Sequence, residues 1–311
     1  MLANILKLGK IALHKQSLVK TKPVVVAVPE VLREVTPVEI PLAAERRYRW
    51  STRPVGHPVS LKQEADTKYP RDIWVGSVER DMSGKLYIVA TPIGNLEDIT
   101  LRAVRVLREV DLIAAENTRH ALKLLSHYQV KTRIVVYSRD RNTHQAASIL
   151  KRVEEGADAA LITNAGTPGI SDPGSYLVRS ALARGFPVIP IPGPSAFAAA
   201  VSVSGMPSAG LVFLGYLSPR KGRRKKQLER FSSEDLTLVI YESPHRLAGT
   251  LEDIYRVMGA RTVVVARELT KKFEEVLRAD IRALIDVFRE RKPRGEFTLL
   301  ICGKGCEEKD D

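Results

Sequence analysis

Two neighbouring segments of the chain each end an apolar run in a turn that contains glycine and proline. Residues 159–163 lead into Asn-Ala-Gly-Thr-Pro at 164–168, and residues 188–191 lead into Pro-Gly-Pro-Ser-Ala at 192–196. Such punctuation is typical of an open sheet in which strands alternate with helices, and ligands of these sheets bind outside the carboxyl ends of the strands. The pattern therefore predicts a ligand pocket that is lined by backbone.

Composition narrows the class of protein. The chain has 311 residues, 44% of them apolar, which is enough for two domains with a sizeable core. No apolar run approaches the roughly 20 residues of a membrane span, so no membrane association is predicted. The formal net charge of +13 indicates an anionic partner such as nucleic acid, although a basic surface that is merely solvated is the alternative.

Cysteine and histidine usage gives no sign of a metal site. Cys302 and Cys306 have no histidines nearby, so we expect free thiols in a reducing compartment, which favours the cytoplasm. The six histidines do not fall at metal-ligand spacing, and a metal-independent reaction is predicted. The glycine-rich fingerprints of dinucleotide-binding and P-loop proteins are also missing, as are the G-x-S-x-G and H-E-x-x-H motifs.

The chain changes character near Met82. Residues 1–81 hold seven prolines and no sustained periodicity, so we predict a mostly irregular N-terminal extension over residues 1–83. Two interpretations of it stay open: an organelle-targeting segment, and an upstream extension of a protein that naturally begins at Met82.

Strands and helices alternate regularly after this extension. Apolar runs at 86–90, 111–115, 134–137, 159–163 and 188–191 read as strands, and a helix of small residues follows at 196–203. The pattern restarts beyond Pro207, with strands expected at 211–217, 236–241, 262–266 and 297–301. We predict two α/β domains, at 84–207 and 208–304, with a cleft between them as the ligand site, and a charged tail at 305–311.

Five motifs occur in order along the chain. They are Leu-Tyr-Ile-Val-Ala-Thr-Pro-Ile-Gly-Asn-Leu at 86–96, Ala-Ala-Glu-Asn-Thr-Arg-His at 114–120, Ala-Gly-Thr-Pro at 165–168 with Ser-Asp-Pro-Gly at 171–174, Pro-Gly-Pro-Ser-Ala at 192–196, and Tyr-Glu-Ser-Pro-His-Arg at 241–246. Together they resemble a family of small-subunit ribosomal RNA ribose methyltransferases within the tetrapyrrole methylase superfamily. The resemblance covers roughly residues 84–304 and nothing before Met82.

The resemblance implies a fold, a cofactor and a partner. It implies two α/β domains of the tetrapyrrole methylase type, S-adenosylmethionine as methyl donor, and 2′-O-methylation of a cytidine ribose in small-subunit (16S) ribosomal RNA. The acceptor would be this RNA or the 30S particle, and the enzyme would be a homodimer. By this resemblance the cofactor contacts Pro92, Asn164, Ala165, Gly166, Ile170, Ser195, Ala196 and Tyr241, while Glu268, Leu269 and Thr270 close over the adenine.

Two positions depart from the family pattern. The family usually has aspartate where this chain has Asn117 and Asn164. If a carboxylate at position 164 served the cofactor, asparagine would lower affinity; if the loop binds through its backbone, asparagine preserves the shape, and we favour the second interpretation. A purely local role is also open, since asparagine tolerates a left-handed turn.

The implied chemistry needs an aligned ribose hydroxyl and, optionally, a general base. Alignment with the sulfonium methyl can supply much of the acceleration, and a base can add a factor of about 10² to 10⁴. The candidates for base or orienting group are Glu116, Glu242 and His245. Arg119 and Arg246 would hold the phosphate beside the target nucleotide. The alternatives are a helix-capping interaction for Glu116 with Arg119 and a local hydrogen bond for His245.

The strongest electrostatic feature is a run of six cations within residues 220–226. Such a cluster needs a polyanion or solvent to offset its self-repulsion, and we expect it to bind ribosomal RNA; a solvated helix start is the alternative. The predicted RNA-binding residues are Arg220, Lys221, Arg223, Arg224, Lys225, Lys226 and Arg246.

Two other functions fit parts of the pattern. A tetrapyrrole (precorrin-type) C-methyltransferase would share the fold and the cofactor, and its carboxylate-rich substrate could also use a basic loop. A non-catalytic ribosome-binding protein would explain Asn117 and Asn164 as marks of a decayed site. The 241–246 motif and the basic run favour RNA methylation.

Overall fold

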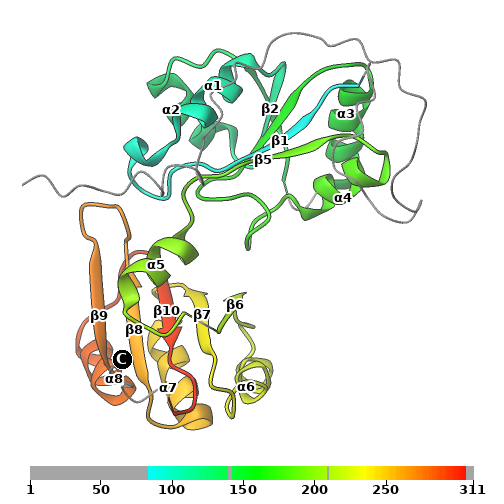
Figure 1. Cartoon of the computed structure of the whole chain (residues 1–311). Coiled ribbons are helices and arrows are strands. Elements are labelled where there is room, and N and C mark those ends of the chain that lie inside the picture. The colour runs from blue at the N-terminus through cyan, green and yellow to red at the C-terminus, as the bar shows by residue number, and fades with distance from the viewer. Residues whose placement is uncertain (1–82, 139–141, 209, 306–311) are drawn as a thin grey trace, which may run out of the picture. The chain divides into compact units, whose positions relative to one another are not determined.

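A computed structural model describes residues 83–138, 142–208 and 210–305, which form two five-stranded sheets (Figure 1). In the first sheet all strands are parallel, in the order β3-β2-β4-β1-β5. The strands are β1 (Leu86–Val89), β2 (Leu112–Ala115), β3 (Arg133–Val136), β4 (Ala159–Ile162) and β5 (Val188–Ile191). The strand positions predicted from the sequence are confirmed here to within two residues at each end.

Helices cover both faces of the first sheet. The helices are η3 (Leu96–Asp98), α1 (Leu101–Glu109), α2 (Thr118–His127), α3 (Asn142–Glu154) and α4 (Ser175–Ala183). Apolar side chains of α1 and α2 pack on one face, and those of α3 and α4 pack on the other. Because β2 and β4 are covered on both sides, their residues are buried throughout, as their unbroken apolar sequences require.

Two polar residues start helices α1 and α2 beside the strand ends. The Thr100 hydroxyl accepts a hydrogen bond from the amide of Ala103 at 3.1 Å, and the Asn117 side chain accepts one from His120 at 3.2 Å. Asparagine and aspartate are about equally good at this position, since both supply an oxygen to a free helix amide. Asn117 therefore supplies the same helix cap that an aspartate at this position would supply.

The second sheet has the order β6-β7-β10-β8-β9 and is mostly antiparallel, with β6 parallel to β7. Its strands are β6 (Leu211–Tyr216), β7 (Thr237–Glu242), β8 (Thr262–Arg267), β9 (Glu275–Asp280) and β10 (Phe297–Ile301). Strand β9 was not predicted from the sequence. This edge strand alternates half-buried and exposed residues and carries three charged side chains, so it lacks the apolar run used to find the others.

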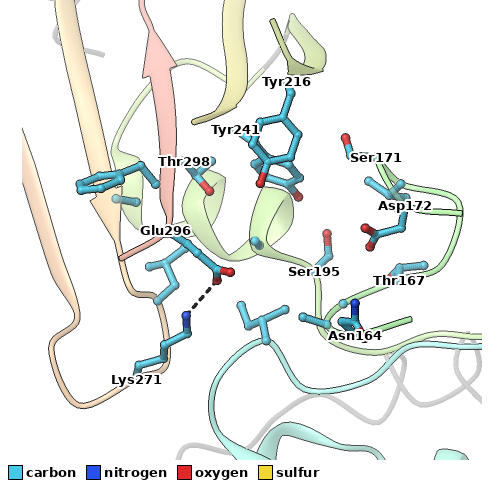
Figure 2. Close-up of a pocket in the computed structure, with 18 of the residues that line it drawn as sticks. Asn164, Thr167, Ser171, Asp172, Ser195, Tyr216, Tyr241, Lys271, Glu296 and Thr298 are labelled. Atoms are coloured by element: carbon cyan, nitrogen blue, oxygen red, sulfur yellow. Dashed lines mark hydrogen bonds and ion pairs between the residues drawn. The ribbon is translucent and has the colours of Figure 1, made fainter. Parts of the chain in front are cut away.

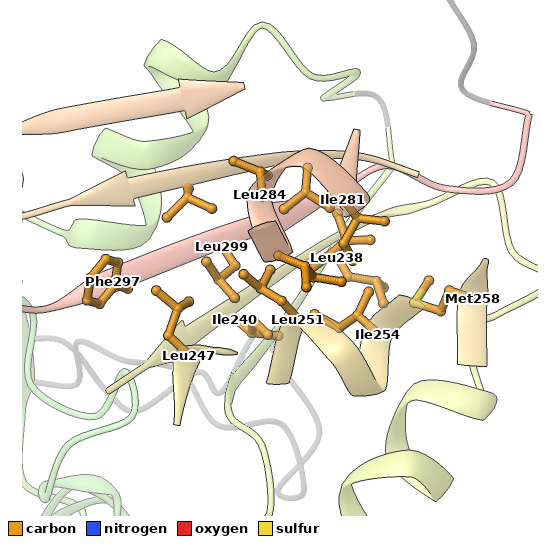
Figure 3. Packing of buried hydrophobic residues seen from close by; sticks show 14 of the residues in the cluster. Leu238, Ile240, Leu247, Leu251, Ile254, Met258, Ile281, Leu284, Phe297 and Leu299 are labelled. Carbon is orange, nitrogen blue, oxygen red and sulfur yellow. The ribbon is translucent and has the colours of Figure 1, made fainter. Parts of the chain in front are cut away.

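Helices α6 (Lys221–Glu229), α7 (Leu247–Met258) and α8 (Ile281–Glu290) accompany the second sheet. Leu238 and Ile240 of β7 and Leu299 of β10 pack against Leu251 of α7 and Leu284 of α8 (Figure 3). Full burial of each such side chain contributes about 1.5–3 kcal/mol. This cluster is the main core of the second sheet.

Helix α5 (Ala196–Ser204) lies on the opposite face of the second sheet. Its Ala200 is fully buried with Val239, Val264 and Leu300, one residue from each of three neighbouring strands. The small residues of α5 permit this close approach, as expected from the sequence. The domain boundary at residues 207 and 208 stays a prediction, although α5 precedes it and packs on the second sheet.

Some expectations fall outside the described residues or are corrected. The N-terminal extension, residue 83 apart, lies outside them, as do Cys306 and the rest of the tail beyond Gly305. The expectation of free thiols is wrong for Cys302, which is buried and disulfide-bonded. Within residues 83–305, apart from the two short gaps, no helix is long and apolar enough to cross a membrane, and no group of three or more potential metal ligands occurs.

Candidate active site

A pocket of about 300 Å³ lies at the carboxyl ends of β2, β4 and β5, where the loops of the first sheet meet residues of the second (Figure 2). A volume of this size lies at the lower end of the range for small-molecule sites. Its walls combine backbone, hydroxyl, carboxylate and apolar groups. The lining residues are Ile93, Glu116, Asn164, Ala165, Gly166, Thr167, Ile170, Ser171, Asp172, Ser195, Ala196, Tyr216, Tyr241, Ala266, Leu269, Lys271, Glu296, Phe297 and Thr298.

Backbone hydrogen bonds hold the first-sheet loops together. Thr91 and Gly166 exchange both of their backbone hydrogen bonds, each at 2.9 Å, and this joins the loops that follow β1 and β4. The Thr167 hydroxyl donates to the carbonyl of Pro194 at 3.1 Å, which ties in the loop that follows β5. The glycine- and proline-rich turns found in the sequence are thus brought to one place.

Three non-glycine residues around the pocket have left-handed backbone conformations. These are Ser171 (φ 65°), Glu268 (φ 50°) and Thr270 (φ 65°). Among the described residues, Gln129 is the only other non-glycine residue with a positive φ. Strained conformations of this kind cost of order 1–3 kcal/mol each and cluster at functional sites. Their concentration here supports the assignment of the pocket as the functional site.

Glu116 and Asn164 meet at the ends of β2 and β4. The Asn164 side-chain amide donates to the Glu116 carboxylate at 3.0 Å, and both residues line the pocket. The asparagine is therefore a partner for the neighbouring carboxylate, which adds a contact to the backbone role favoured from the sequence. The hydrogen bond fixes one carboxylate oxygen and leaves the other able to accept.

Tyr241 of β7 anchors the beginning of α5. Its hydroxyl accepts a hydrogen bond from the amide of Phe197 at 3.0 Å, and so satisfies one of the free amides of the first helical turn. Burial raises the pKa of the Tyr241 phenol above its ordinary value. The phenol therefore stays neutral through the physiological range and acts as a fixed hydrogen-bonding group.

Lys271 joins two glutamates on the second-sheet side of the pocket. Its ammonium lies 2.9 Å from Glu268 and 2.8 Å from Glu296. Burial works against ionisation of Glu268, but the hydrogen bonds from Lys271 and from the Glu296 amide leave the pKa of this carboxyl below its ordinary value. A further hydrogen bond, from the amide of Asn95 to the Thr270 hydroxyl at 3.1 Å, links the loop after β1 to this segment.

Most of the predicted cofactor contacts come together. Asn164, Ala165, Gly166, Ile170, Ser195, Ala196, Tyr241 and Leu269 line the pocket, which makes eight of the eleven. Pro92, Glu268 and Thr270 are not part of its lining. Glu268 and Thr270 lie behind the lining residues, where Glu268 accepts a hydrogen bond from Lys271 and Thr270 accepts one from the amide of Asn95.

The predicted catalytic residues separate into two groups. Glu116 lines the pocket, whereas Arg119 and His245 are exposed and are not among its lining residues. Glu242 is buried inside the protein, where its carboxylate accepts hydrogen bonds from Thr250 at 2.7 Å and the Ser243 amide at 2.8 Å. Glu242 therefore has a structural role, and its prediction as a general base is wrong because its carboxylate is buried away from the pocket.

The basic run forms the start of α6, and its residues differ in exposure. Arg220, Lys221, Arg223 and Lys226 are exposed, and Lys225 is half-buried. Arg224 is buried and donates two hydrogen bonds, at 2.9 and 2.6 Å, to Asp253 of α7. Its prediction as an RNA contact is corrected, because its charge is already paired inside the protein.

Arg246 is also engaged within the protein. Its guanidinium donates to the carbonyl of Leu217 at 2.7 Å, and its Nε lies 3.3 Å from the carboxylate of Glu242. The side chain thus supports the segment between β6 and α6. Arg246 therefore has a structural role, and its contact with RNA stays a prediction.

Several residues that line the pocket could not be predicted from the local sequence as site residues. Lys271, Glu296 and Thr298 belong to strands or loops of the second sheet and carry no turn signature. Asp172 belonged to a quoted motif, so its position could have been anticipated. Tyr216 ends an ordinary apolar strand, and nothing in the local pattern indicates that its ring faces the pocket.

The pocket lies at the carboxyl ends of a parallel sheet and is closed by a second sheet, and comparison with known proteins gives the class to which this arrangement belongs. Residues 85–285 match the family described as Tetrapyrrole (Corrin/Porphyrin) Methylases, and the chain belongs to that family. A solved structure of uroporphyrin-III C-methyltransferase from Thermus thermophilus, complexed with S-adenosyl homocysteine, has a TM-score of 0.52 and 18% identity, covering 71% of this chain and 98% of that chain. At that identity the likeness supports the fold alone.

Within the family the chain is similar to proteins named ribosomal RNA small subunit methyltransferase I. It is 45% identical over 227 residues to the one from Halalkalibacterium halodurans, with 73% of this chain and 78% of the relative covered. It is 44% identical over 221 residues to the one from Thermotoga maritima, with 71% of this chain and 99% of the relative covered. The chain is therefore a methyltransferase whose methyl donor is S-adenosylmethionine.

The pocket suits this donor chemically. Ile93, Leu269 and Phe297 provide apolar surface for an adenine ring. Backbone and hydroxyl groups around the turns can meet a ribose and an amino-acid group, and the positive φ of Gly166 allows close backbone approach. The lining residues include three carboxylates, Glu116, Asp172 and Glu296, and one lysine, Lys271, so the pocket has an excess of negative charge. This suits S-adenosylmethionine, which carries two positive groups, a sulfonium and an ammonium, and one carboxylate.

Proposed function

We propose that this chain methylates the 2′-hydroxyl of a cytidine ribose in small-subunit (16S) ribosomal RNA, in the cytoplasm and as a homodimer. The observation that carries the proposal is the exposed basic face of α6, which begins five residues after the pocket-lining Tyr216. The names of the relatives support ribosomal RNA as the acceptor. The family resemblance of the five motifs supports the ribose position and the dimer.

The proposal assigns binding roles to two sets of residues. Backbone and hydroxyl groups of residues 164–167 and 195–196 would hold S-adenosylmethionine, which supplies an electrophilic methyl group on its sulfonium. RNA phosphates would be bound by the exposed cations at the start of α6, because charges at the surface can reach a large anionic partner. These residues are Arg220, Lys221, Arg223 and Lys226.

Glu116 is the proposed general base. It is one of three carboxylates that line the pocket, and its hydrogen bond to Asn164 orients it there. Its second oxygen can accept the proton from the acceptor hydroxyl.

The test is transfer of labelled methyl groups to purified small-subunit RNA and to 30S particles, followed by mapping of the modified ribose. Label on a cytidine 2′-oxygen supports the proposal. Label on a base, or transfer only to a tetrapyrrole precursor, would replace it, and binding of particles without S-adenosylmethionine binding would indicate a non-catalytic ribosome-binding protein.

A pair of variants tests the base. Glu116→Gln should lower kcat by about 10²- to 10⁴-fold, and it should weaken the Kd for S-adenosylmethionine by a much smaller factor. Glu109→Gln is the matched control, because Glu109 is an exposed residue of α1 paired with Arg105. Equal activity of the two variants would remove Glu116 from the mechanism.

A further inference from the structure

Tyr216 presents an exposed aromatic ring at the pocket, and no role in binding S-adenosylmethionine or in proton transfer has been assigned to it. Its side chain lines the pocket and is 55% exposed. The other aromatic lining residues described here are Tyr241, which is half-buried, and Phe297, which is 2% exposed. Figure 2 shows the Tyr216 ring beside Tyr241, across from Ser171 and Asp172.

A bulge in β6 turns Tyr216 to this face. Phe213 pairs with Val239 and Tyr216 pairs with Tyr241, so three steps along β6 correspond to two steps along β7. Regular alternation would put Tyr216 on the opposite face, where Leu214 packs into the main core. The extra residue is accommodated at Gly215, whose φ of 61° is easy only for glycine.

The ring is held from behind by other aromatic residues. Tyr216 meets Tyr241 edge to face with ring centroids 5.7 Å apart, and Tyr241 meets Phe213 in the same way at 5.0 Å. Such pairs contribute about 0.5–1.5 kcal/mol beyond buried area. Since Tyr241 is itself hydrogen-bonded to α5, Tyr216 rests on a fixed support and does not need ordering by a ligand.

The chain that follows leads directly to the basic face of α6. Leu217 is buried, and its carbonyl accepts a hydrogen bond from Arg246. The amide of Ser218 donates to Gln227 of α6 at 2.8 Å. The pocket-lining ring and the exposed cations at Arg220 and Lys221 are therefore joined by a short, well-anchored segment.

We propose that Tyr216 is a stacking platform for an unpaired nucleobase, which it holds while the ribose of the same nucleotide enters the pocket and α6 binds the adjoining phosphates. Bases of single-stranded RNA stack readily on exposed aromatic rings, whatever their sequence. This inference rests on the proposed RNA function and adds a subsite to it. Tyr216 is a positioning residue and takes no part in bond making.

The test compares Tyr216→Ala and Tyr216→Phe with the wild type. Stacking on one ring is worth about 1–3 kcal/mol, so loss of the ring should raise the KM for 30S particles or small-subunit RNA by roughly 5- to 150-fold. The phenylalanine variant should stay near the wild type, because it keeps the ring. The matched control is Tyr255→Ala, which removes a partly exposed tyrosine of α7 outside the pocket.

Binding of S-adenosylmethionine, measured by calorimetry, separates a folded variant from a damaged one. Its Kd should be unchanged in Tyr216→Ala. An equal loss of cofactor and RNA affinity would assign the ring to the cofactor and overturn the proposal. An unchanged KM for RNA, or a phenylalanine variant as weak as the alanine variant, would also overturn it.

A second readout works without turnover. A short single-stranded RNA containing 2-aminopurine should lose fluorescence on binding to wild type and Tyr216→Phe, but not to Tyr216→Ala. If wild type shows no methyl transfer to ribosomal RNA, the proposed function fails, and this quenching still decides whether Tyr216 stacks a base. Absence of quenching with wild type, or stronger Tyr216-dependent binding of a porphyrin, would refute the stacking platform.

Discussion

Replacement of Arg224 by alanine should destabilise the protein far more than it weakens RNA binding. The Arg224 and Asp253 side chains are only 10% and 1% exposed, and they are joined by two hydrogen bonds to a single carboxylate oxygen. The other oxygen, Oδ1, is buried without a hydrogen bond, and the guanidinium of Arg256 lies 4.0 Å from it. The alanine variant therefore leaves a buried carboxylate almost uncompensated.

The expected magnitude follows from this burial. Removal of one partner of a buried ion pair costs about 3–5 kcal/mol. For a folded unit of this size, each kcal/mol lowers Tm by roughly 2–4 °C, so a decrease of roughly 6–20 °C is expected. Thermal unfolding followed by circular dichroism measures it.

The matched control is Arg223→Ala, one residue away and exposed. A surface substitution of this kind changes stability by about 0.5 kcal/mol or less. If Arg223 contacts a phosphate, its loss should reduce the slope of log binding constant against log salt by about 0.7–0.9. Arg224→Ala should leave that slope unchanged.

A double variant tests the cause. Replacement of both partners by apolar residues, Arg224→Met with Asp253→Leu, removes the buried charge and should restore most of the lost Tm. The reasoning is refuted if Arg224→Ala melts no lower than Arg223→Ala. It is also refuted if the double variant is no more stable than Arg224→Ala.

Three further variants test the pocket. Tyr241→Phe leaves a helix amide of α5 without its acceptor and should cost about 1–3 kcal/mol, seen as a lower Tm and a weaker S-adenosylmethionine Kd by calorimetry. Burial opposes ionisation of Glu268, but its contacts with Lys271 keep the pKa of this carboxyl below its ordinary value. The ionised carboxylate therefore stabilises the fold at pH values above the ordinary glutamate pKa of about 4.3, and this stabilisation is lost as the pH falls further. Tm should fall more steeply with acid in wild type than in Glu268→Gln. Gly215→Ala would put a Cβ 2.5 Å from the Ser171 hydroxyl, and the positive φ at this position costs a non-glycine residue about 1–2 kcal/mol. The variant should therefore have a lower Tm and weaker RNA binding. A Tm equal to that of wild type would contradict the conclusion that the β6 bulge requires glycine.

The sequence by itself determined nine of the ten strands of the described residues and the first-sheet loops that line the pocket. Apolar runs, glycine and proline turns, and caps such as Thr100 are local signals, because each depends on residues a few positions apart. The turns at 164–168 and 192–196 could thus be assigned to one pocket from the sequence alone, since parallel strands bring their carboxyl ends to one edge of a sheet.

Only the tertiary structure decided which charged and aromatic side chains reach that pocket. Arg224 and Arg223 are adjacent and chemically alike, yet one is buried against Asp253, 29 residues away, and the other is exposed. Strand β9 has no apolar run, so its sequence does not predict a strand. The bulge before Tyr216 places this side chain on the face opposite to the one that regular alternation predicts. The burial of a side chain and the residue with which it pairs depend on packing between distant segments, and the local sequence pattern does not predict this packing.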